Sequence, residues 1–571
     1  MDWPEAVRKG EAWAAGLNAV LAVGLWLTRK WWRMPAEAGR ESPAPVTARE
    51  KSPRWWLAAL IGCVIVCGAV RWNFSHRSLW WDEMWNAREA TVGEFRPDKK
   101  HPGAMKFHPS TWSQALWNFR KPTNHSAFTV LSKACHEAWA AIARPPAGVF
   151  SEFVLRLPNF LLSMATVWMV GWLLRAWGYP SAGLLAALWL AIHPWFIRYG
   201  VDGRAYTLLT ALTAAQMHVL WRLIGRDPAP WGARARWWWV FGLLQGWIVW
   251  ANVWAVWLAG AFFAVAAAAI FEEWPKAVRW QGLRRLAGVN IVGAMIFLQL
   301  FLPNLLQLVS WDGRNADGQL LSASVLNQTL QLATLGVTPA LFHQPDDALI
   351  ASATRTTSIA TPAMAVVLIL AAFGVARLLR EKRWACWSAV SVLAGAAAFL
   401  LIGRVTGQFF YPRFIVPVVV PLVILASLGL RGRLALAFCV PLLGVLWIAA
   451  AGVDVFQRRP YAPLRDVAAF LQQQPPGAIH IGYGLGGEML AGYWPNVVPV
   501  KKELGRPEVD AALATGKTVY VAVGYNDLNR QKMPDGFVLL DDRRRFEEIA
   551  VFHGIEPDFT FRVLRSVSPP K

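Results

Sequence analysis

The chain has 571 residues, of which 55% are hydrophobic and only 16% are charged. Several apolar runs approach the roughly 20 residues that a bilayer-spanning helix needs, and they are apolar on all sides, which excludes an ordinary soluble multidomain protein. The net charge of +21 lies mostly in the short gaps between these runs, where it indicates membrane topology and argues against nucleic-acid binding. Five scattered cysteines form neither a disulfide framework nor a CxxC metal site.

Twelve apolar runs predict an all-α polytopic bundle of about twelve transmembrane helices. In chain order they cover residues 13–28, 55–70, 153–177, 180–197, 204–223, 237–250, 253–271, 286–306, 361–379, 384–402, 414–430 and 434–450. Many of the 35 tryptophans stand at the ends of these runs, where an indole rests at the level of the lipid headgroups. Residues 1–54 form an extra N-terminal helix and a basic linker, and residues 55–451 form the main transmembrane domain.

Lysine and arginine residues gather in alternate gaps between the predicted helices. The first gap alone holds seven of them between Arg29 and Arg54. The positive-inside rule assigns this side to the cytoplasm. The large loop of residues 71–152, the loop of residues 307–360 and the C-terminal part are then extracytoplasmic. We therefore expect a multi-pass protein of a bacterial plasma (inner) membrane.

Residues 452–571 change in character and predict a small, soluble, extracytoplasmic α/β domain. An amphipathic helix is expected at residues 466–473, with strands at 478–481 and 518–523. The first strand is followed by glycines 482, 484 and 487 in a GxGxxG pattern. The domain is too small for a full dinucleotide-binding fold, so we do not interpret this pattern as a cofactor site.

The strongest candidate site directly follows the second apolar run, where Asp82 and Glu83 come after two tryptophans. Glycosyl transfer needs a base for the acceptor hydroxyl and anionic stabilisation of an oxocarbenium-like transition state, and carboxylates supply both. The neighbouring indoles would raise a carboxylate pKa by desolvation. The same residues also fit an interfacial aromatic belt followed by a solvated acidic turn.

Two further groups lie at helix ends on the same side. Asp202, Arg204 and Tyr206 occupy a short turn between two apolar runs, and Arg413 opens a later one. Charges at membrane depth usually face a functional cavity, and an arginine there binds phosphate well. An Asp202–Arg204 ion pair within the turn and an Arg413 that anchors its helix end are the alternatives.

The large loop supplies a third group of polar candidates: Lys121, Asn124 and His125. Half of the ten histidines lie in this loop, at positions 76, 101, 108, 125 and 136. Their spacing matches no zinc motif, which argues against a dedicated zinc site.

In this order and spacing, the groups resemble the glycosyltransferase-C superfamily, in particular protein O-mannosyltransferases, aminoarabinose transferases of lipid A and their bacterial relatives. The likeness covers about residues 55–450, and the first helix lies outside the common core. Ser126 stands where the family's Asn-His-Pro motif has proline. The residues that carry the resemblance are Asp82-Glu83, Asn124-His125-Ser126, Arg156-Leu157-Pro158, Asp202-Gly203-Arg204-Ala205-Tyr206 and Arg413-Phe414.

The resemblance implies a membrane glycosyltransferase that moves a hexosyl or pentosyl group, with inversion, from a polyprenyl-phosphate donor to an extracytoplasmic glycan, lipid or protein acceptor. Asp82 would be the general base, Glu83 would orient it or share its proton, and Asp202 would be a second carboxylate near the sugar. The leaving phosphate would be neutralised by Arg204, Arg413 and either Lys121 or His125, with Tyr206 and Asn124 lining the substrate site. Some members of the superfamily hold a divalent metal such as Mg or Mn, which Asp82 and Asp202 would ligate here, and others hold none.

Two other functions stay open at this point. A transporter or flippase for a lipid-linked glycan predicts internal repeats or broken helices with polar residues deep in the spans. A non-catalytic membrane scaffold with an external binding domain predicts that Asp82 and Arg204 do not converge.

Overall fold

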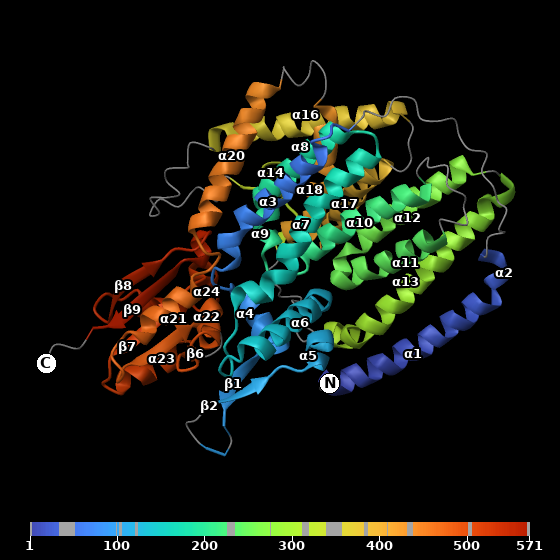
Figure 1. The fold of residues 1–571 in the computed structure, drawn as a ribbon. Coiled ribbons are helices and arrows are strands. Elements are labelled where there is room, and N and C mark those ends of the chain that lie inside the picture. Colours follow the sequence, from blue (N-terminus) through green and yellow to red (C-terminus); the bar gives the residue numbers. More distant parts are fainter. Residues whose placement is uncertain are drawn as a thin grey trace.

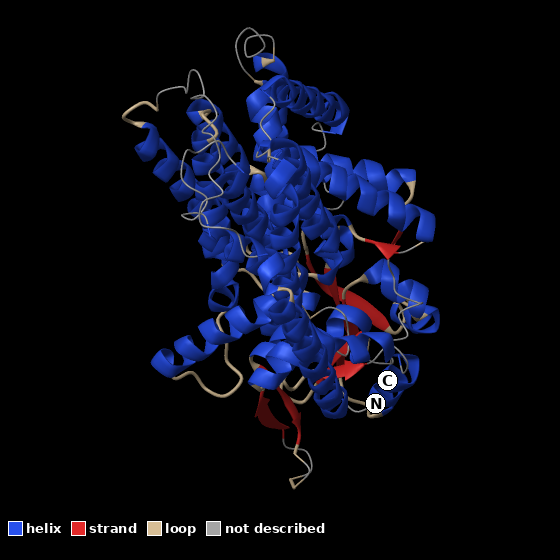
Figure 2. Cartoon of the chain, turned by 90° about the vertical axis from the view of Figure 1, so that its right-hand side faces the viewer, coloured by secondary structure: helices blue, strands red, loops and turns tan. Residues whose placement is uncertain are grey.

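The fold is a bundle of long helices with a small sheet-containing domain at one end (Figure 1). The structure is a computed structural model. It describes residues 3–32, 52–98, 100–101, 105–119, 124–224, 235–274, 276–310, 319–338, 357–381, 386–407, 409–430, 438–500 and 505–567. The predicted site residue Lys121 lies outside this part of the chain. Helices dominate, and the few strands are short (Figure 2).

Each of the twelve predicted spans coincides with a helix, so the predicted polytopic all-α bundle is confirmed. The helices are α1 (Trp3–Leu27), α3 (Trp56–Ser75), α7 (Glu152–Ala176), α8 (Pro180–Ile192) with α9 (Pro194–Gly200), α10 (Tyr206–Ile224), α11 (Ala235–Ala251), α12 (Val256–Glu273), α13 (Lys276–Ser310), α16 (Thr357–Glu381), α17 (Trp387–Thr406), η8 (Pro412–Val418) with α18 (Val419–Gly429), and α20 (Cys439–Arg458). The short α2 (Arg29–Trp32) and η3 (Val253–Ala255) flank α1 and α12.

Among the described residues, nine helices are long and apolar enough to cross a bilayer, and ten if the bent pair α8–α9 counts as one span. The two predicted spans that do not meet these conditions are α10 and α11. The 17 residues of α11 are slightly short for a bilayer. Helix α10 carries threonines and a glutamine that are buried inside the bundle, where Thr210 and Thr213 donate to backbone carbonyls of their own helix.

Glycines bring some of these helices into close contact. A Cβ added at Gly242, Gly246 or Gly293 would collide with the backbone of the facing helix in the α11–α13 pair. A Cβ added at Gly374 or Gly429 would likewise collide with the backbone of the facing helix in the α16–α18 pair. Small residues at helix crossings allow the close van der Waals packing that associates helices in membranes. Helix α1 packs along α13, where Asn18 Nδ2 donates to the Met295 carbonyl at 3.0 Å.

The connection between α3 and α7 folds as a compact unit of its own. It contains α4 (Trp81–Asn86), the π-helical turn η1 (Ala87–Thr91), the antiparallel hairpin β1 (Gly93–Pro97) and β2 (Met105–Pro109), α5 (Trp112–Trp117) and α6 (Ser126–Ala143). Helix α3 continues to Ser75, so this loop begins at residue 76, beyond the buried Arg71. A second connection contributes β3 (Gln319–Leu320), paired with β4 (Phe409–Phe410), and α14 (Ala323–Leu335).

After α20 the chain forms the predicted C-terminal α/β domain. Its elements are α21 (Leu464–Gln472), β5 (Ile479–Tyr483), α22 (Gly484–Gly487), η9 (Glu488–Gly492), β6 (Val498–Val500), α23 (Gly505–Ala514), β7 (Val519–Val523), α24 (Asn526–Lys532), α25 (Pro534–Leu540), β8 (Phe546–Phe552), η10 (Pro557–Phe559) and β9 (Phe561–Ser566). The five strands form one mixed sheet in the order β6-β5-β7-β9-β8. Strand β5 is parallel to both neighbours, and β9 is antiparallel to both of its own.

The C-terminal domain and the first large loop meet at the same end of the bundle (Figure 1). Arg465 Nη1 in α21 pairs with Glu152 Oε1 at the start of α7 at 3.0 Å. The Tyr493 hydroxyl accepts the Leu79 N–H at 2.8 Å and also contacts Glu152. The two regions therefore lie on one side of the helical bundle, as the charge pattern predicts.

Candidate functional site

The acidic pair opens the short helix α4. Trp80 is extended (φ −96°, ψ 177°) and precedes the first helical residue, and its N–H donates to Glu83 Oε2 at 3.2 Å. Successive helical residues point in different directions, so Asp82 and Glu83 face different partners. Both side chains are buried: Asp82 is 3% exposed and Glu83 is 3% exposed. This burial excludes the solvated acidic turn as the structure of this segment.

Glu83 is held in place by an arginine and a backbone amide. Arg156 Nε donates to Glu83 Oε1 at 2.7 Å, and its Nη2 donates to Oε2. The Gly203 N–H also donates to Oε1, at 2.5 Å. The guanidinium of Arg156 further donates to backbone carbonyls of the segment that enters α4, namely those of Phe74, Ser75, Arg77 and Ser78. The Glu83–Arg156 pair thus joins α4, α7 and the Asp202 turn.

Asp82 lies between two arginines from distant parts of the chain. Its Oδ2 is 3.8 Å from Arg204 Nη2 and 3.8 Å from Arg413 Nη1. Within the described residues this oxygen has no hydrogen-bond partner, and neither do Arg204 Nε, Arg204 Nη1 and Arg413 Nε. At these distances the groups form ion pairs, but the atoms are too far from each other for hydrogen bonds. The arrangement leaves acceptor and donor capacity for a polar ligand.

The third carboxylate, Asp202, lies in the turn between α9 and α10. Its Oδ1 accepts the Trp80 Nε1–H at 3.0 Å, and Asn159 in α7 bonds the turn backbone, donating to the Arg204 carbonyl at 2.6 Å and to that of Asp202. Burial, together with the nearby Glu83 carboxylate, raises the pKa of Asp202 to about 7. The Arg204 guanidinium turns to Asp82, so the ion pair of this turn reaches across to α4.

The predicted loop residues Asn124 and His125 lie next to this turn. His125 Nδ1 accepts the Ala205 N–H at 3.0 Å, and its ring meets the Tyr206 ring edge-on at 5.2 Å. Burial and the nearby arginines, Arg204 and Arg413, lower the pKa of His125 well below its usual value, so the imidazole is neutral. Asn124 Oδ1 accepts from Thr129 at 2.7 Å, which fixes the start of α6.

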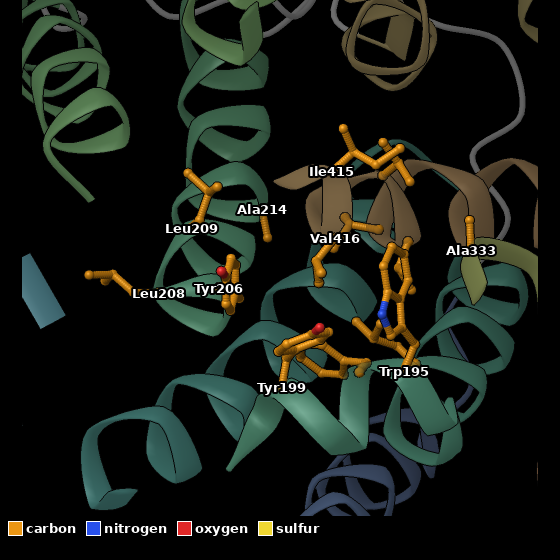
Figure 3. Packing of buried hydrophobic residues seen from close by; sticks show 14 of the residues in the cluster. Trp195, Tyr199, Tyr206, Leu208, Leu209, Ala214, Ala333, Ile415 and Val416 are labelled. Atoms are coloured by element: carbon orange, nitrogen blue, oxygen red, sulfur yellow. The ribbon is translucent and has the colours of Figure 1, made fainter. Parts of the chain in front are cut away.

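Aromatic rings surround the charged groups. The Arg413 guanidinium lies 4.4 Å from the centre of the Tyr411 ring and 5.9 Å from that of Trp80, distances at which cation–π attraction operates. Tyr206 also meets Tyr199 edge-on at 4.9 Å, and these rings lie beside the buried start of α10 (Figure 3). The site is therefore walled by apolar surface, which strengthens the electrostatic interactions inside it.

Sequence reasoning did not single out some residues that the structure brings to this site. Arg198 in α9 pairs with Glu556 Oε1 at 2.9 Å and with the Tyr461 hydroxyl, both in the C-terminal region. Asn159 bonds the backbone of the Asp202 turn, as described above. Both residues follow or precede recognisable motifs by a few positions, but their partners lie far away in the chain. No local sequence pattern predicts these long-range contacts of Arg198 and Asn159.

The carboxylates of Asp82, Glu83 and Asp202 are not arranged as a binding site for a divalent cation. Both oxygens of Glu83 and Oδ1 of Asp202 already accept hydrogen bonds, and Asp82 faces two positive guanidinium groups. Across the part of the chain that the structure describes, no group of three or more His, Cys, Asp or Glu side chains could hold a metal ion. We therefore derive no step through a metal.

No protein-family model and no curated protein matches the chain. Among solved structures, it is similar to ArnT from Cupriavidus metallidurans in the apo state, with 14% identity over 90% of this chain and 99% of that one and a TM-score of 0.49. The same protein bound to undecaprenyl phosphate gives 13% identity over 90% and 99%, with a TM-score of 0.47. The archaeal oligosaccharyltransferase AglB from Archaeoglobus fulgidus, in complex with an inhibitory peptide and a dolichol-phosphate, gives 11% identity over 83% and 70%, with a TM-score of 0.44.

Proposed function

We propose that the protein is a membrane glycosyltransferase that transfers a sugar from a polyprenyl-phosphate donor to an extracytoplasmic acceptor. The observation that carries this proposal is the position of the Asp82 carboxylate, buried and 3.8 Å from each of two arginines. Three separate elements, α4, the Asp202 turn and η8, contribute these charges to one place at an end of the bundle. Bringing buried charges together in this way is costly, and it fits a functional site.

The two arginines provide the phosphate side of the reaction. Arg204 and Arg413 keep unbonded guanidinium nitrogens, and guanidinium groups bind phosphate oxygens through two parallel hydrogen bonds. Their fixed charge would stabilise the phosphate as the bond from the anomeric carbon to the phosphate oxygen breaks. The neutral His125 would position Ala205 and Tyr206 and add no charge.

Asp82 provides the base. Its free Oδ2 would accept the proton of the acceptor hydroxyl while the acceptor oxygen forms its bond to the anomeric carbon. Attack and departure on opposite faces of the sugar in a single displacement invert the anomeric configuration. Polyprenyl phosphate leaves with the bonding electrons, and its charge is offset by the arginines.

The other carboxylates act through their neighbours. Glu83, fully bonded to Arg156, Gly203 and Trp80, would hold α4 and the Asp202 turn in register so that Asp82 points at the arginines. Asp202 would lie near the sugar as a second carboxyl group. Asn124 would fix the start of α6, and Lys121 would be a further cation.

The position of the site also supports an enzyme over the alternatives. The scaffold hypothesis predicts that the side chains of Asp82 and Arg204 do not converge. Their charged atoms are only 3.8 Å from each other, which argues against it. The polar groups converge where helices end and the loop and C-terminal domain meet, while a transporter needs them deep in the spans. With the basic gaps in the cytoplasm, the site would open on the extracytoplasmic side of a bacterial inner membrane, where a lipid-linked donor and a polar acceptor can meet.

The test is Asp82→Asn in the full chain, purified and placed in lipid nanodiscs. Transfer from radiolabelled undecaprenyl-phosphate hexoses and pentoses to a membrane extract from a strain lacking the protein should fall by about 10²–10⁴-fold, the usual contribution of a general base. Undecaprenyl phosphate should still bind, because the arginines remain. Asp454→Asn, which removes an exposed carboxylate on α20, is the matched control. Transfer by Asp82→Asn close to that of the control would refute Asp82 as the base.

A further inference from the structure

The C-terminal domain covers the helix that carries Asp82. Trp81 Nε1 donates to Glu488 Oε1 at 3.3 Å, and Arg88 Nη1 donates to the Glu488 carbonyl at 3.3 Å. Phe559 from η10 meets the Trp80 ring edge-on at 6.3 Å. The domain is therefore part of the wall around the site.

One of them, Tyr525, has an unusual backbone. It lies in the left-handed region (φ 53°, ψ 46°), which costs a residue with a side chain on the order of 1 kcal/mol or more. The surrounding structure holds it there, since its N–H donates to the Asp558 carbonyl at 2.7 Å and its carbonyl accepts from Asn529 at 2.8 Å. Non-glycine residues held in this conformation cluster at functional sites.

The glycine-rich loop after β5 makes room for the Tyr525 ring. Gly486 has φ +81°, and a Cβ placed on it would lie 2.5 Å from Tyr525 Cδ2. The same loop is tied to α24 by Asn529, whose Oδ1 accepts the Leu485 N–H and whose Nδ2 donates to the Leu485 carbonyl, both at 3.0 Å. The glycines of the GxGxxG pattern therefore leave space for the Tyr525 side chain. In a dinucleotide-binding fold, the same glycines would leave space for a phosphate.

The Tyr525 ring packs beside the segment that carries Asp82: it meets Phe559 edge-on at 4.9 Å, and Phe559 in turn meets Trp80. The side chain is buried (8% exposed), and its oxygen lies against the Trp81 backbone within electrostatic range of the Asp82 carboxylate. Within the described chain no group accepts the hydroxyl proton by distance and angle, and the Trp81 backbone, which lowers the pKa of the phenol, acts only as a donor. A buried hydroxyl without a partner costs free energy, which a bound ligand would recover.

We propose that Tyr525 is a substrate-contacting residue of this site, carried by the C-terminal domain, and that its hydroxyl donates a hydrogen bond to the acceptor hydroxyl beside Asp82. This inference rests on the proposed function. The carboxylates of Asp82, Asp558 and Glu556 all act electrostatically on the Tyr525 phenol, and this negative surrounding disfavours a phosphate and favours a neutral, hydroxyl-bearing acceptor. The donor phosphate lies with the arginines.

Burial, with the Asp82 charge, raises the pKa of Tyr525 well above its usual value. The phenol therefore stays protonated and can donate throughout the physiological range. A hydrogen bond from the Tyr525 hydroxyl to the oxygen of the acceptor substrate would fix the orientation of that substrate's hydroxyl group. Its proton would then point at Asp82, and its remaining lone pair would point at the anomeric carbon.

The first test is Tyr525→Phe, which keeps the ring and removes only the hydroxyl. We expect kcat/KM for the acceptor to fall about tenfold, the value of one hydrogen bond to an uncharged group. The affinity for undecaprenyl phosphate should not change. The melting temperature should stay level or rise, because an unpartnered buried hydroxyl is removed. A lower melting temperature would show that the hydroxyl is structural, and weaker undecaprenyl phosphate binding would place it on the donor side; either result overturns the proposal.

The second test moves the ring without altering it. Gly486→Ala should reduce transfer at least as much as Tyr525→Phe, because the new Cβ displaces the ring. Gly516→Ala is the matched control, since Gly516 also has a positive φ (+73°) in the same domain but has nothing within 4 Å of an added Cβ. Equal transfer by the two glycine variants would overturn the proposal. If the wild-type chain itself transfers no sugar while it folds normally, the proposed function fails, and a fall in melting temperature for Tyr525→Phe still decides against the hydroxyl as a ligand group.

Discussion

Replacing Arg156 by methionine tests how strongly the bundle depends on the Glu83–Arg156 pair. Both side chains are nearly inaccessible, at 3% and 2% exposure, so the change leaves a carboxylate in a dry environment with only two backbone N–H groups as partners. Breaking a buried ion pair in this way costs about 3–5 kcal/mol. The double variant Glu83→Gln with Arg156→Met removes both charges, so we expect it to recover most of that loss.

Stability would be measured by SDS titration from mixed micelles, followed by the fluorescence of the many tryptophans. Arg565→Met is the matched control, because it breaks an exposed pair with Glu547 that is worth about 0–1 kcal/mol. The reasoning is refuted if Arg156→Met is no less stable than Arg565→Met. It is also refuted if the losses of the two single variants at positions 83 and 156 simply add in the double variant.

Three further predictions concern the charged groups of the site. The pKa of Asp202 is about 7 in the folded state and about 3.8 in the unfolded state, so between these values the folded state binds one more proton. The free energy of unfolding should therefore fall as the pH rises from about 4 to about 7. In unfolding titrations at successive pH values, Asp202→Asn should remove this pH dependence. Trp80→Phe removes the N–H that lowers the pKa of Asp202, so the slope should extend to higher pH, and an unchanged profile would contradict this. Arg413→Lys keeps the charge but loses the planar fork, so the Kd for undecaprenyl phosphate should rise about tenfold, with Arg506→Lys on the exposed face of α23 as the unaffected control.

The sequence predicts the helices well because apolar runs are a local signal. Asp82, Arg204 and Arg413 could also be singled out, because each stands at the end of such a run on the same predicted side. Their 3.8 Å separations could not be predicted, since they depend on how α4, the Asp202 turn and η8 pack.

The partners of Glu83 show the same limit. Residues 83, 156 and 203 are each recognisable as motif members, yet nothing local states that they bond one another. In the C-terminal domain, the segments of β5 and β7 are predicted as strands separated by Pro/Gly turns, and both predictions are confirmed. Strand β6 contains a proline at position 499, and β8 has two consecutive exposed glutamates after its first residue, so neither has a clear strand pattern.

The seven-residue helix α9 connects the two halves of the site mechanically. It is set off from α8 by a bend of 64°, and Arg198 on it grips Glu556 and Tyr461. The chain then runs directly from its last residue into the turn that carries Asp202 and Arg204. We therefore expect that breaking the Arg198 contacts with the C-terminal domain would also shift the turn that holds Arg204 beside Asp82. On this view, docking of the C-terminal domain and alignment of Arg204 with Asp82 depend on each other through α9.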